Sequence, residues 1–421
     1  MDKFVVHGGK KLSGEISISG AKNASLALMP ASLLASGISI LENTPELNDV
    51  YTMMKLLNHL GVESTFQNHT LKLNTNNITS LEAPYEHVKK MRASVYVLGP
   101  LLAKFGFAKV SLPGGCAWGP RPINLHIEGF KKMGAQIELE EGYIIAKSKR
   151  LKGAKITFDV SSVGATGNIL MASVLAKGTT IINNAAMEPE ISNLIEFLVK
   201  MGAKINGLGT STLEIEGVEE LKSDRIITIP DRIEAGTLLI AAAITRGKIS
   251  LLNMPSKYLY SVLTKLEDSG CKILISNDII HLDGVNNGIN SSNITTAIYP
   301  GFPTDMQAQW TAYMAVANGV STVTDTIYLD RFKHVPELVR LGANITVNEN
   351  SAVIKGVNKL TGAKVMSTDL RASASLVLAG LAAEGVTEVL RVYHLDRGYQ
   401  RIEEKLSMLG ADIKRVEGKE F

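Results

Sequence analysis

Residues 111–127, SLPGGCAWGPRPINLHI, combine features that suit covalent or acid–base chemistry. Cys116 is one of only two cysteines in 421 residues, and it follows two glycines. Arg121 lies five residues later, between Pro120 and Pro122. A fixed positive charge favours the thiolate of a nearby cysteine, and the thiolate is the reactive form. The loop therefore suits a thiol that exchanges a proton or attacks an electrophile, although a free cysteine also commonly packs as a small hydrophobe.

An internal repeat places other charged residues at equivalent positions. A five-residue phrase with glycine at its second position, such as MGAKI or LGANI, recurs six times at intervals of 68 to 73 residues. Its glycines are Gly61, Gly134, Gly202, Gly270, Gly342 and Gly410. Six units of nearly constant length indicate a sixfold repeat of one supersecondary element.

Each repeat contains the same succession of predicted elements. A small-residue helix, apolar on nearly all sides, comes first, as in AGTLLIAAAITRG, and a glycine ends it. A strand, an amphipathic helix that ends at the marker glycine and two short alternating strands follow. The sequence therefore predicts the order β-α-β-α-β-β six times.

Two loops of the repeat collect the charged residues. The loop before the apolar helix holds Lys22, Arg92, Arg232, Asp305 and Arg371, and the loop after the strand holds Cys116, Arg121, Arg331 and Arg397. The free N–H groups and the dipole at a helix N-terminus favour anions. Repeats related by rotation would gather these loops at one end of each lobe, which indicates an anion-binding site.

The composition excludes several classes of protein. The chain has 44 basic and 41 acidic residues, so its net charge of +3 gives no reason to expect a nucleic-acid partner. Two cysteines make no disulfide framework, and no metal-type Cys/His spacing is present. The start lacks a signal-peptide core, and no run of about 20 apolar residues suggests membrane insertion. We expect a cytoplasmic protein of two or three domains.

Several longer motifs resemble those of the UDP-N-acetylglucosamine enolpyruvyl transferases (1-carboxyvinyltransferases), which share a superfamily with EPSP synthase. The motifs, spread from residue 1 to about residue 416, are SGAKNASL, MRASVYVLGP, SLPGGC, SVGAT, EPEI, DRIEAGT, FPTDMQAQ, TDLRASASLVLAGLAAEG and YHLDRGYQRIEEKL. The cysteine loop and DMQAQ are similar to the UDP-sugar enzymes rather than to the shikimate branch.

The resemblance implies a fold and a reaction. The fold is an inside-out α/β barrel with two lobes of three βαβαββ repeats each. One lobe would be residues 21–229 with the Cys116 loop, and the other would be 1–20 plus 230–421 with Asp305. The substrates would be phosphoenolpyruvate and UDP-N-acetylglucosamine, without a metal or an organic cofactor. The sequence leaves the oligomeric state open.

The implied chemistry is addition of the sugar 3′-hydroxyl to phosphoenolpyruvate, followed by elimination of phosphate. By resemblance, Cys116 is the acid at C3, forms a covalent adduct and is the position that fosfomycin alkylates. Asp305 is the candidate base for the hydroxyl. Thr304 or Asp305 also suits the N-cap of the following helix, and the two roles are compatible. Each lobe would supply only part of the charged cluster. Closure of the lobes around anionic substrates would complete it.

The resemblance also assigns binding residues. Lys22, Arg121 and Arg397 would clamp phosphoenolpyruvate, extended by Arg92 and Arg371. Arg331 is a further expected substrate-binding residue. Asn23 would hold sugar hydroxyls or phosphate, or cap a helix, and Asp369 and Glu188 would orient cations or form salt bridges. The residues expected to contact the UDP-sugar are Arg121, Pro122, Ile123, Asn124, Leu125, Ser162, Val163, Gly164, Asp305 and Ile327. His126, His394 and Cys271 are interpreted as structural.

Some positions depart from the family pattern, and other functions remain open. Val160 stands where Lys is usual, which puts one uridine-side or phosphate contact in doubt, and Leu329-Asp330 replaces Glu-Asn. Trp118 and Pro120 replace smaller residues of the thiol loop. The alternatives are an enolpyruvyl transferase for shikimate 3-phosphate or another nucleotide sugar, a non-catalytic UDP-sugar sensor, and a redox thiol protein, which would lack a resolving cysteine near Cys116.

Overall fold

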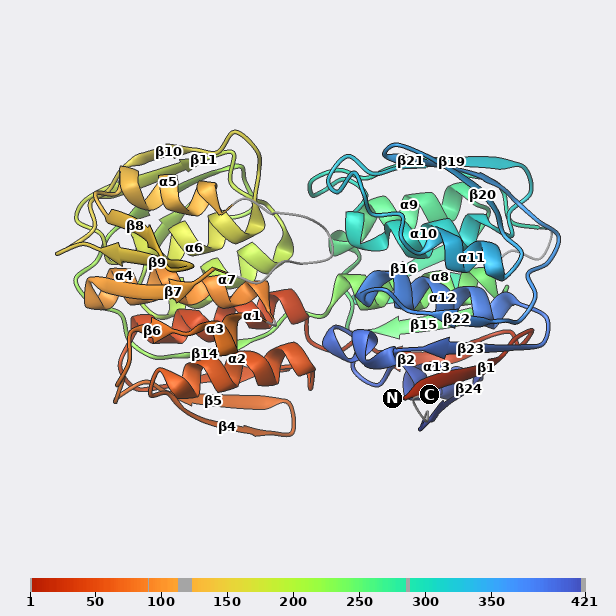
Figure 1. The fold of residues 1–421 in the computed structure, drawn as a ribbon, viewed down its shortest axis with the longest axis horizontal. Coiled ribbons are helices and arrows are strands. Elements are labelled where there is room, and N and C mark those ends of the chain that lie inside the picture. The colour runs from red at the N-terminus through yellow and green to blue at the C-terminus, as the bar shows by residue number, and fades with distance from the viewer. Residues whose placement is uncertain (1, 90, 113–122, 285–287, 418–421) are drawn as a thin grey trace. The chain divides into compact units, whose positions relative to one another are not determined.

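The computed structural model describes residues 2–89, 91–112, 123–284 and 288–417. The chain divides into two compact units. The first unit is Gly20–Ile229, and the second unit joins Met1–Ser19 to Pro230–Phe421. Figure 1 shows the elements of both units.

The first unit is built from three repeats of mixed helices and strands. In chain order its helices and strands are α1 (Lys22–Ala31), β3 (Ile38–Glu42), α2 (Asn48–His59), β4 (Glu63–Gln67), β5 (Thr70–Asn74), β6 (Glu82–Ala83), α3 (Tyr85–Val88), α4 (Leu98–Phe105), β7 (Phe107–Ser111), α5 (Asn124–Lys132), β8 (Gln136–Glu140), β9 (Tyr143–Lys147), β10 (Lys155–Thr157), α6 (Val163–Ser173), β11 (Thr179–Asn183), α7 (Pro189–Lys200), β12 (Lys204–Asn206), β13 (Thr212–Glu216) and β14 (Arg225–Ile227).

The second unit repeats the same plan. Its helices and strands are β1 (Lys3–His7), β2 (Ser13–Ser17), α8 (Arg232–Ile244), β15 (Lys248–Leu252), α9 (Tyr260–Asp268), β16 (Lys272–Ser276), β17 (Ile279–Asp283), β18 (Ile294–Thr295), α10 (Gln307–Met314), β19 (Val320–Thr324), α11 (Val335–Arg340), β20 (Asn344–Asn348), β21 (Ser351–Lys355), β22 (Lys364–Met366), α12 (Leu370–Ala382), β23 (Val386–Leu390), α13 (Ile402–Met408) and β24 (Asp412–Val416).

Within the described residues, each of the six repeats forms one four-stranded sheet. In the third repeat the order is β10-β11-β13-β12, with β10 and β11 parallel and the remaining neighbours antiparallel. The predicted order β-α-β-α-β-β is therefore confirmed as the organising pattern, in a mixed α/β fold.

The strands of a repeat are not always contiguous in sequence. Strand β14, at the end of the first unit, pairs in parallel with β3 near its start. In the second unit, β2 pairs in parallel with β15, and β1 lies between β23 and β24 with antiparallel register. The N-terminal strands thus complete the fourth and sixth sheets, which explains why Met1–Ser19 belongs to the second unit.

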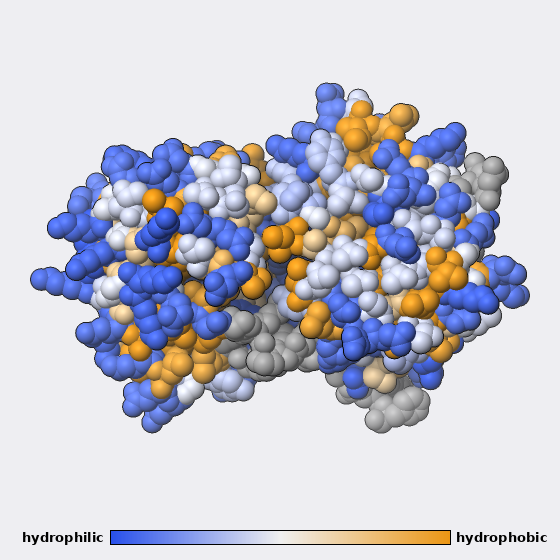
Figure 2. Space-filling view, turned by 90° about the horizontal axis from the view of Figure 1, so that it is seen from above, coloured by the Kyte–Doolittle hydropathy of each residue, from blue (hydrophilic) through white to orange (hydrophobic). Residues whose placement is uncertain are grey.

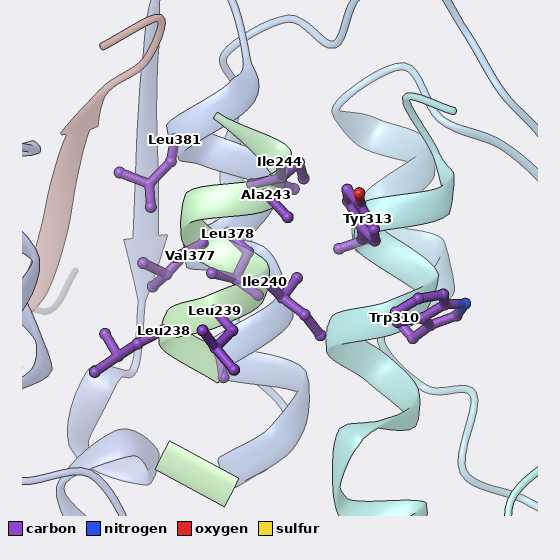
Figure 3. Packing of buried hydrophobic residues seen from close by; sticks show 14 of the residues in the cluster. Leu238, Leu239, Ile240, Ala243, Ile244, Trp310, Tyr313, Val377, Leu378 and Leu381 are labelled. Carbon is purple, nitrogen blue, oxygen red and sulfur yellow. The ribbon is translucent and has the colours of Figure 1, made fainter. Parts of the chain in front are cut away.

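The small-residue helices form the centre of each unit. Every residue of α10 is buried, and α8 is buried from Ile233 to Ile244. In the second unit α8, α10 and α12 pack against one another, and Figure 3 shows Ile240 and Tyr313 between α8 and α10. In the first unit α4 packs against α6, and the 3₁₀ turn before α4 packs against α1. Strands such as β23 alternate buried and exposed residues, so the sheets cover the helices.

The marker glycine of the repeat has a backbone reason. All six marker glycines have positive φ, from 86° at Gly134 to 108° at Gly202. A residue with a Cβ is strained in this region, whereas glycine is not. Each marker glycine follows the amphipathic helix and reverses the chain into the next strand. The glycines expected to end the small-residue helices act less uniformly: α4 ends directly at Gly106, with φ 72°, while α1 continues into a 3₁₀ turn.

The surface is consistent with this arrangement. In the face shown in Figure 2, hydrophilic residues cover most of the described surface and hydrophobic residues form small groups. Among the described residues, no helix is both long enough and apolar enough to cross a membrane.

Candidate active site

A carboxylate held between two arginines is the main feature of the second unit. Asp305 lies in the 3₁₀ turn Thr304–Met306 that leads into α10. Its Oδ1 lies 2.8 Å from Arg331 Nη2, and its Oδ2 lies 2.8 Å from Arg371 Nη2. The Arg331 and Arg371 side chains are only 9% and 6% exposed, whereas that of Asp305 is 28% exposed. The carboxylate therefore joins the start of α12 to the loop after β19.

The two guanidinium groups determine the charge of this cluster. Burial opposes the charge of Arg371, but the Asp305 carboxylate, together with Tyr399 and Asp231, offsets that cost and raises the pKa of the guanidinium above its usual range. The same contacts favour the ionised form of Asp305. A carboxylate stabilised in this way is a weak base until an arginine finds another anionic partner.

The predicted N-cap role of Thr304 or Asp305 is wrong. The residue before the 3₁₀ turn is Pro303, α10 begins after Met306, and neither cap position has a side-chain hydrogen bond. The Asp305 side chain accepts hydrogen bonds from Arg331 and Arg371, which lie on other segments of the chain. Charge-assisted hydrogen bonds from arginine are stronger than those from neutral backbone N–H groups, so the Asp305 carboxylate binds the nearby arginines.

Other acidic residues do cap the central helices of this unit. Asp369 Oδ1 accepts from the backbone N–H groups of Arg371, at 2.9 Å, and Ala372, at 3.1 Å, at the start of α12. Asp231 caps α8 in the same way. Each cap fixes the first turn of its helix, and the cap on α12 also fixes the backbone of an arginine that binds Asp305.

Arg397 and Asp369 lie near a common histidine. Arg397 ends the 3₁₀ turn Val392–Arg397 and is half-buried. Burial lowers the pKa of His394, the Asp369 carboxylate opposes that effect, and Arg397 and Arg391 add to it. The half-buried Ile327 lies in the loop that leads from β19 to Arg331.

In the first unit, candidate residues lie at the starts of three central segments. Lys22 begins α1, Arg92 begins the 3₁₀ turn before α4, and Ser162 caps α6 by accepting from Ala165 N at 3.3 Å. That 3₁₀ turn packs against both α1 and α6, so Arg92 lies on a segment that contacts the other two. Lys22 Nζ lies 3.5 Å from Asp49 Oδ2, and both side chains are largely buried.

The remaining expected contacts of the first unit have definite places. Asn23 is exposed on the first turn of α1, and the cap position there is Ala21, so Asn23 is not the N-cap. Val163 and Gly164 form the first turn of α6. Three further residues lie at the start of α5, which packs against α6: Ile123, Asn124 and Leu125. Glu188 precedes α7 at its N-cap position. Val160, which replaces the usual lysine, is 65% exposed.

Three of the predicted site residues, Cys116, Arg121 and Pro122, lie outside the described residues. The other cysteine, Cys271, is buried, and burial raises the pKa of its thiol. Its sulfur lies 3.6 Å from Tyr313 Oη. Among the residues that the structure describes, no group of three or more His, Cys, Asp or Glu side chains is placed to hold a metal ion.

A group of buried polar residues next to the Asp305 backbone, Gln309, Thr237 and Tyr399, was not identified from the sequence. Gln309 Nε2 donates to the backbone oxygen of Asp305 at 3.0 Å and to the hydroxyls of Tyr399 and Thr237 at 3.1 Å. Thr237 and Tyr399 also bond to each other at 2.9 Å. The sequence signal for this group is Gln309 in a helix whose residues are all buried, because a buried amide needs internal partners.

The comparisons with known proteins agree with this architecture. Residues 6–406 match the family model described as EPSP synthase (3-phosphoshikimate 1-carboxyvinyltransferase). A protein from Chloroherpeton thalassium named UDP-N-acetylglucosamine 1-carboxyvinyltransferase is 60% identical over 424 residues, covering 100% of this chain and 99% of its own. A protein of the same name from Chlorobium luteolum is 56% identical, with 100% of both chains covered. The chain belongs to the UDP-N-acetylglucosamine 1-carboxyvinyltransferase family.

Solved structures support the fold. The enolpyruvyl transferase NikO from Streptomyces tendae aligns with a TM-score of 0.89 at 24% identity, covering 99% of both chains. EPSP synthase from Acinetobacter baumannii aligns with a TM-score of 0.77 at 17% identity, covering 99% of this chain and all of its own. The UDP-N-acetylglucosamine 1-carboxyvinyltransferase family thus shares its mixed α/β fold with these more distant enzymes.

A buried histidine near the helix starts gives a testable pH dependence. Burial, and then the charge of Arg92, lower the pKa of His126 to about 4, and its Nδ1 lies 3.1 Å from Asn168 Nδ2. In the folded protein His126 becomes protonated at a lower pH than in the unfolded chain. The free energy of unfolding therefore falls as pH drops from about 6.5 towards 4. A shift of this size corresponds to about 3 kcal/mol. Burial, with Arg331, gives His334 a similarly lowered pKa of about 3.

We expect NMR titration to give His126 a pKa near 4. We also expect His126→Asn to lose less unfolding free energy than the wild type between pH 6.5 and pH 4. Asparagine retains an acceptor near the position of Nδ1 but does not titrate. Titration of His126 near 6.5, or an identical acid-side loss in the variant, would contradict the effect of burial on this group.

Proposed function

We propose that this chain transfers the enolpyruvyl group of phosphoenolpyruvate to the 3′-hydroxyl of UDP-N-acetylglucosamine and releases phosphate, the first committed step of peptidoglycan synthesis. The observation that carries the proposal is 60% identity, over the whole chain, to a protein named for this activity. The clustering of cationic side chains at helix starts supports it, because both substrates are anions. We place the reaction in the cytoplasm, where a lone reactive thiol stays reduced.

The proposed reaction has two balanced steps. In the first, a bond forms between the sugar 3′-oxygen and C2 of phosphoenolpyruvate, the hydroxyl proton goes to a base, and C3 gains a proton. In the second, the bond between C2 and the phosphate oxygen breaks, C3 loses a proton, and phosphate leaves. We assign proton transfer at C3, or a covalent adduct at C2, to Cys116 and removal of the hydroxyl proton to Asp305.

Asp305 fits the role of base only with help from the substrate. Both of its oxygens accept hydrogen bonds from arginines, at 2.8 Å each. Phosphate groups of the substrates compete for those guanidinium groups, because arginine binds phosphate as well as carboxylate. Release of one bond leaves a carboxylate oxygen with a lone pair to accept the hydroxyl proton. Binding of an anion would thus activate the base.

The binding residues follow the helix starts. We propose that a group of cationic side chains binds the phosphate and carboxylate of phosphoenolpyruvate, with support from Arg331 and Asp369. The members of this group are Lys22, Arg92, Arg121, Arg371 and Arg397. We propose that the UDP-sugar contacts Asn23, Ile327 and the residues at the starts of α5 and α6. These assignments rest on equivalent repeat positions and on motif resemblance.

The direct test is phosphate release from phosphoenolpyruvate by purified wild-type protein, with each acceptor in turn. We expect sustained release with UDP-N-acetylglucosamine and little with shikimate 3-phosphate or no acceptor. Mass spectrometry should show one enolpyruvyl group added to the UDP-sugar. Release with shikimate 3-phosphate instead would assign the other branch. Binding of the UDP-sugar without any phosphate release would indicate a non-catalytic sensor.

A matched pair of thiol variants tests the role of Cys116. We expect Cys116→Ala to lower turnover by about 10²–10⁴-fold, the usual contribution of a general acid, with little change in UDP-sugar affinity. Cys271→Ala removes the other thiol, which is buried in the second unit, and should keep near wild-type turnover per folded molecule. Fosfomycin should add one covalent mass to the wild type and to Cys271→Ala, but not to Cys116→Ala. Near wild-type turnover of Cys116→Ala would remove this residue from the mechanism.

A further inference from the structure

A fully buried carboxylate lies directly after strand β19. Asp325 is 0% exposed, and its two oxygens accept four hydrogen bonds. Oδ1 accepts from the hydroxyl of Thr296 at 2.8 Å and from the backbone N–H groups of Ile327 at 2.9 Å and Tyr328 at 2.8 Å. Oδ2 accepts from the hydroxyl of Thr304 at 2.7 Å. The carboxylate thus ties the loop after β19 to the turn that carries Asp305.

Thr304 extends this contact to the candidate base. Its hydroxyl hydrogen is directed to Asp325, so the lone pairs of its oxygen are available to other donors. Arg331 Nη1 donates to that oxygen at 2.9 Å, and Arg331 Nη2 donates to Asp305 Oδ1 at 2.8 Å. A continuous series of hydrogen bonds therefore runs from the buried carboxylate, through a hydroxyl and a guanidinium, to Asp305.

Comparison between repeats shows that Asp325 is specialised. The equivalent position, immediately after the strand that follows the central helix, is asparagine in three other repeats. These residues, Asn43, Asn184 and Asn253, have left-handed backbones with φ of 53°, 55° and 58°. The amides of Asn43 and Asn184 donate to the carbonyl oxygens of Thr228 and Phe158.

Asp325 reverses the chemistry of that position. It is not among the residues with positive φ, and its side chain accepts hydrogen bonds where the asparagine amides donate them. A neutral, turn-forming residue is sufficient for the fold, as the asparagines show. A buried carboxylate costs desolvation energy that only its hydrogen-bond donors offset, so its presence in this repeat calls for a reason beyond folding.

We propose that Asp325 is a positioning residue of the transfer reaction. It orients the Asp305 carboxylate through Thr304 and Arg331. It also fixes the conformation of the loop that contacts the UDP-sugar, by accepting from the N–H groups of Ile327 and Tyr328. This inference rests on the proposed function of the site, and it adds to that function a residue that touches neither substrate.

Two isosteric variants separate the two connections. Asp325→Asn removes the negative charge and replaces one oxygen by an amide donor, so either the Thr304 hydroxyl or the donors at Oδ1 lose their acceptor. Thr304→Val removes both hydrogen bonds of the Thr304 hydroxyl, the one to Asp325 and the one from Arg331, and keeps those that the loop N–H groups donate to Asp325. We expect Asp325→Asn to lower kcat about tenfold and raise the KM for UDP-N-acetylglucosamine several-fold. Thr304→Val should lower kcat by about tenfold with both KM values within about twofold of wild type, since the loss of the hydrogen bond that orients Arg331 is worth about tenfold.

The measurements are phosphate release with each substrate varied in turn, and thermal unfolding of each variant. Asn184→Gly is the matched control, because glycine keeps the positive φ of the equivalent turn while losing the amide hydrogen bond. Its kcat and KM per folded molecule should match the wild type. The split between kcat and KM is a result that a purely structural role would not produce.

Three outcomes would overturn the proposal. Folded Asp325→Asn and Thr304→Val with wild-type kcat and KM would remove the positioning role while leaving the proposed function intact. Equal kinetic losses in Asn184→Gly would show a general effect of the repeat turn. Wild-type protein that releases no phosphate with any acceptor would reject the proposed function, and the positioning role with it.

Discussion

The burial of the central helices on all sides is the constraint on which the rest of the structure depends. A helix such as α10, with every residue buried, is not stable on the surface of one sheet, because a sheet covers only one of its faces. The repeat supplies two sister helices as the other partners, α8 and α12. The contact of Arg371 with Asp305 shows that α12 and α10 begin at the same end, and the charge of Asp231, at the start of α8, also acts on Arg371.

We propose that this packing arrangement also forms the binding site. Helix starts carry partial positive charge and free N–H groups, and here they also carry cationic side chains. Acidic residues at the same ends prevent an uncompensated excess of charge. Asp231 and Asp369 cap helices, and Asp305 binds two arginines. The arginines are thus ordered before a substrate arrives, which reduces the entropy that binding must offset.

Much of the architecture could be predicted from the sequence, because the repeat is visible in residue types that the backbone demands. The marker glycines stand where φ is positive, and the all-apolar helices stand where no face meets water. The family was recognisable from motifs that surround the same helix starts. These features are local or periodic, so a single chain displays them.

The details of the second unit's site were less accessible. The prediction that Thr304 or Asp305 caps a helix followed local preference, but arginines distant in sequence determined the outcome. Asp325 and Gln309 were not identified from the sequence, since their importance comes from hydrogen bonds to residues distant in the chain, such as Thr296 for Asp325 and Tyr399 for Gln309. Tertiary hydrogen bonds of this kind do not follow from spacing along the chain. The roles of Cys116 and Arg121 remain predictions from the sequence.

The central claim is that the starts of the buried helices hold the substrate. Hydrogen exchange of the wild-type protein with saturating UDP-N-acetylglucosamine tests it most directly. We predict slower exchange at residues 162–166, 304–309 and 326–331. Protection confined to the opposite helix ends, at residues 174–178 and 244–247, with no change at the starts, would contradict it.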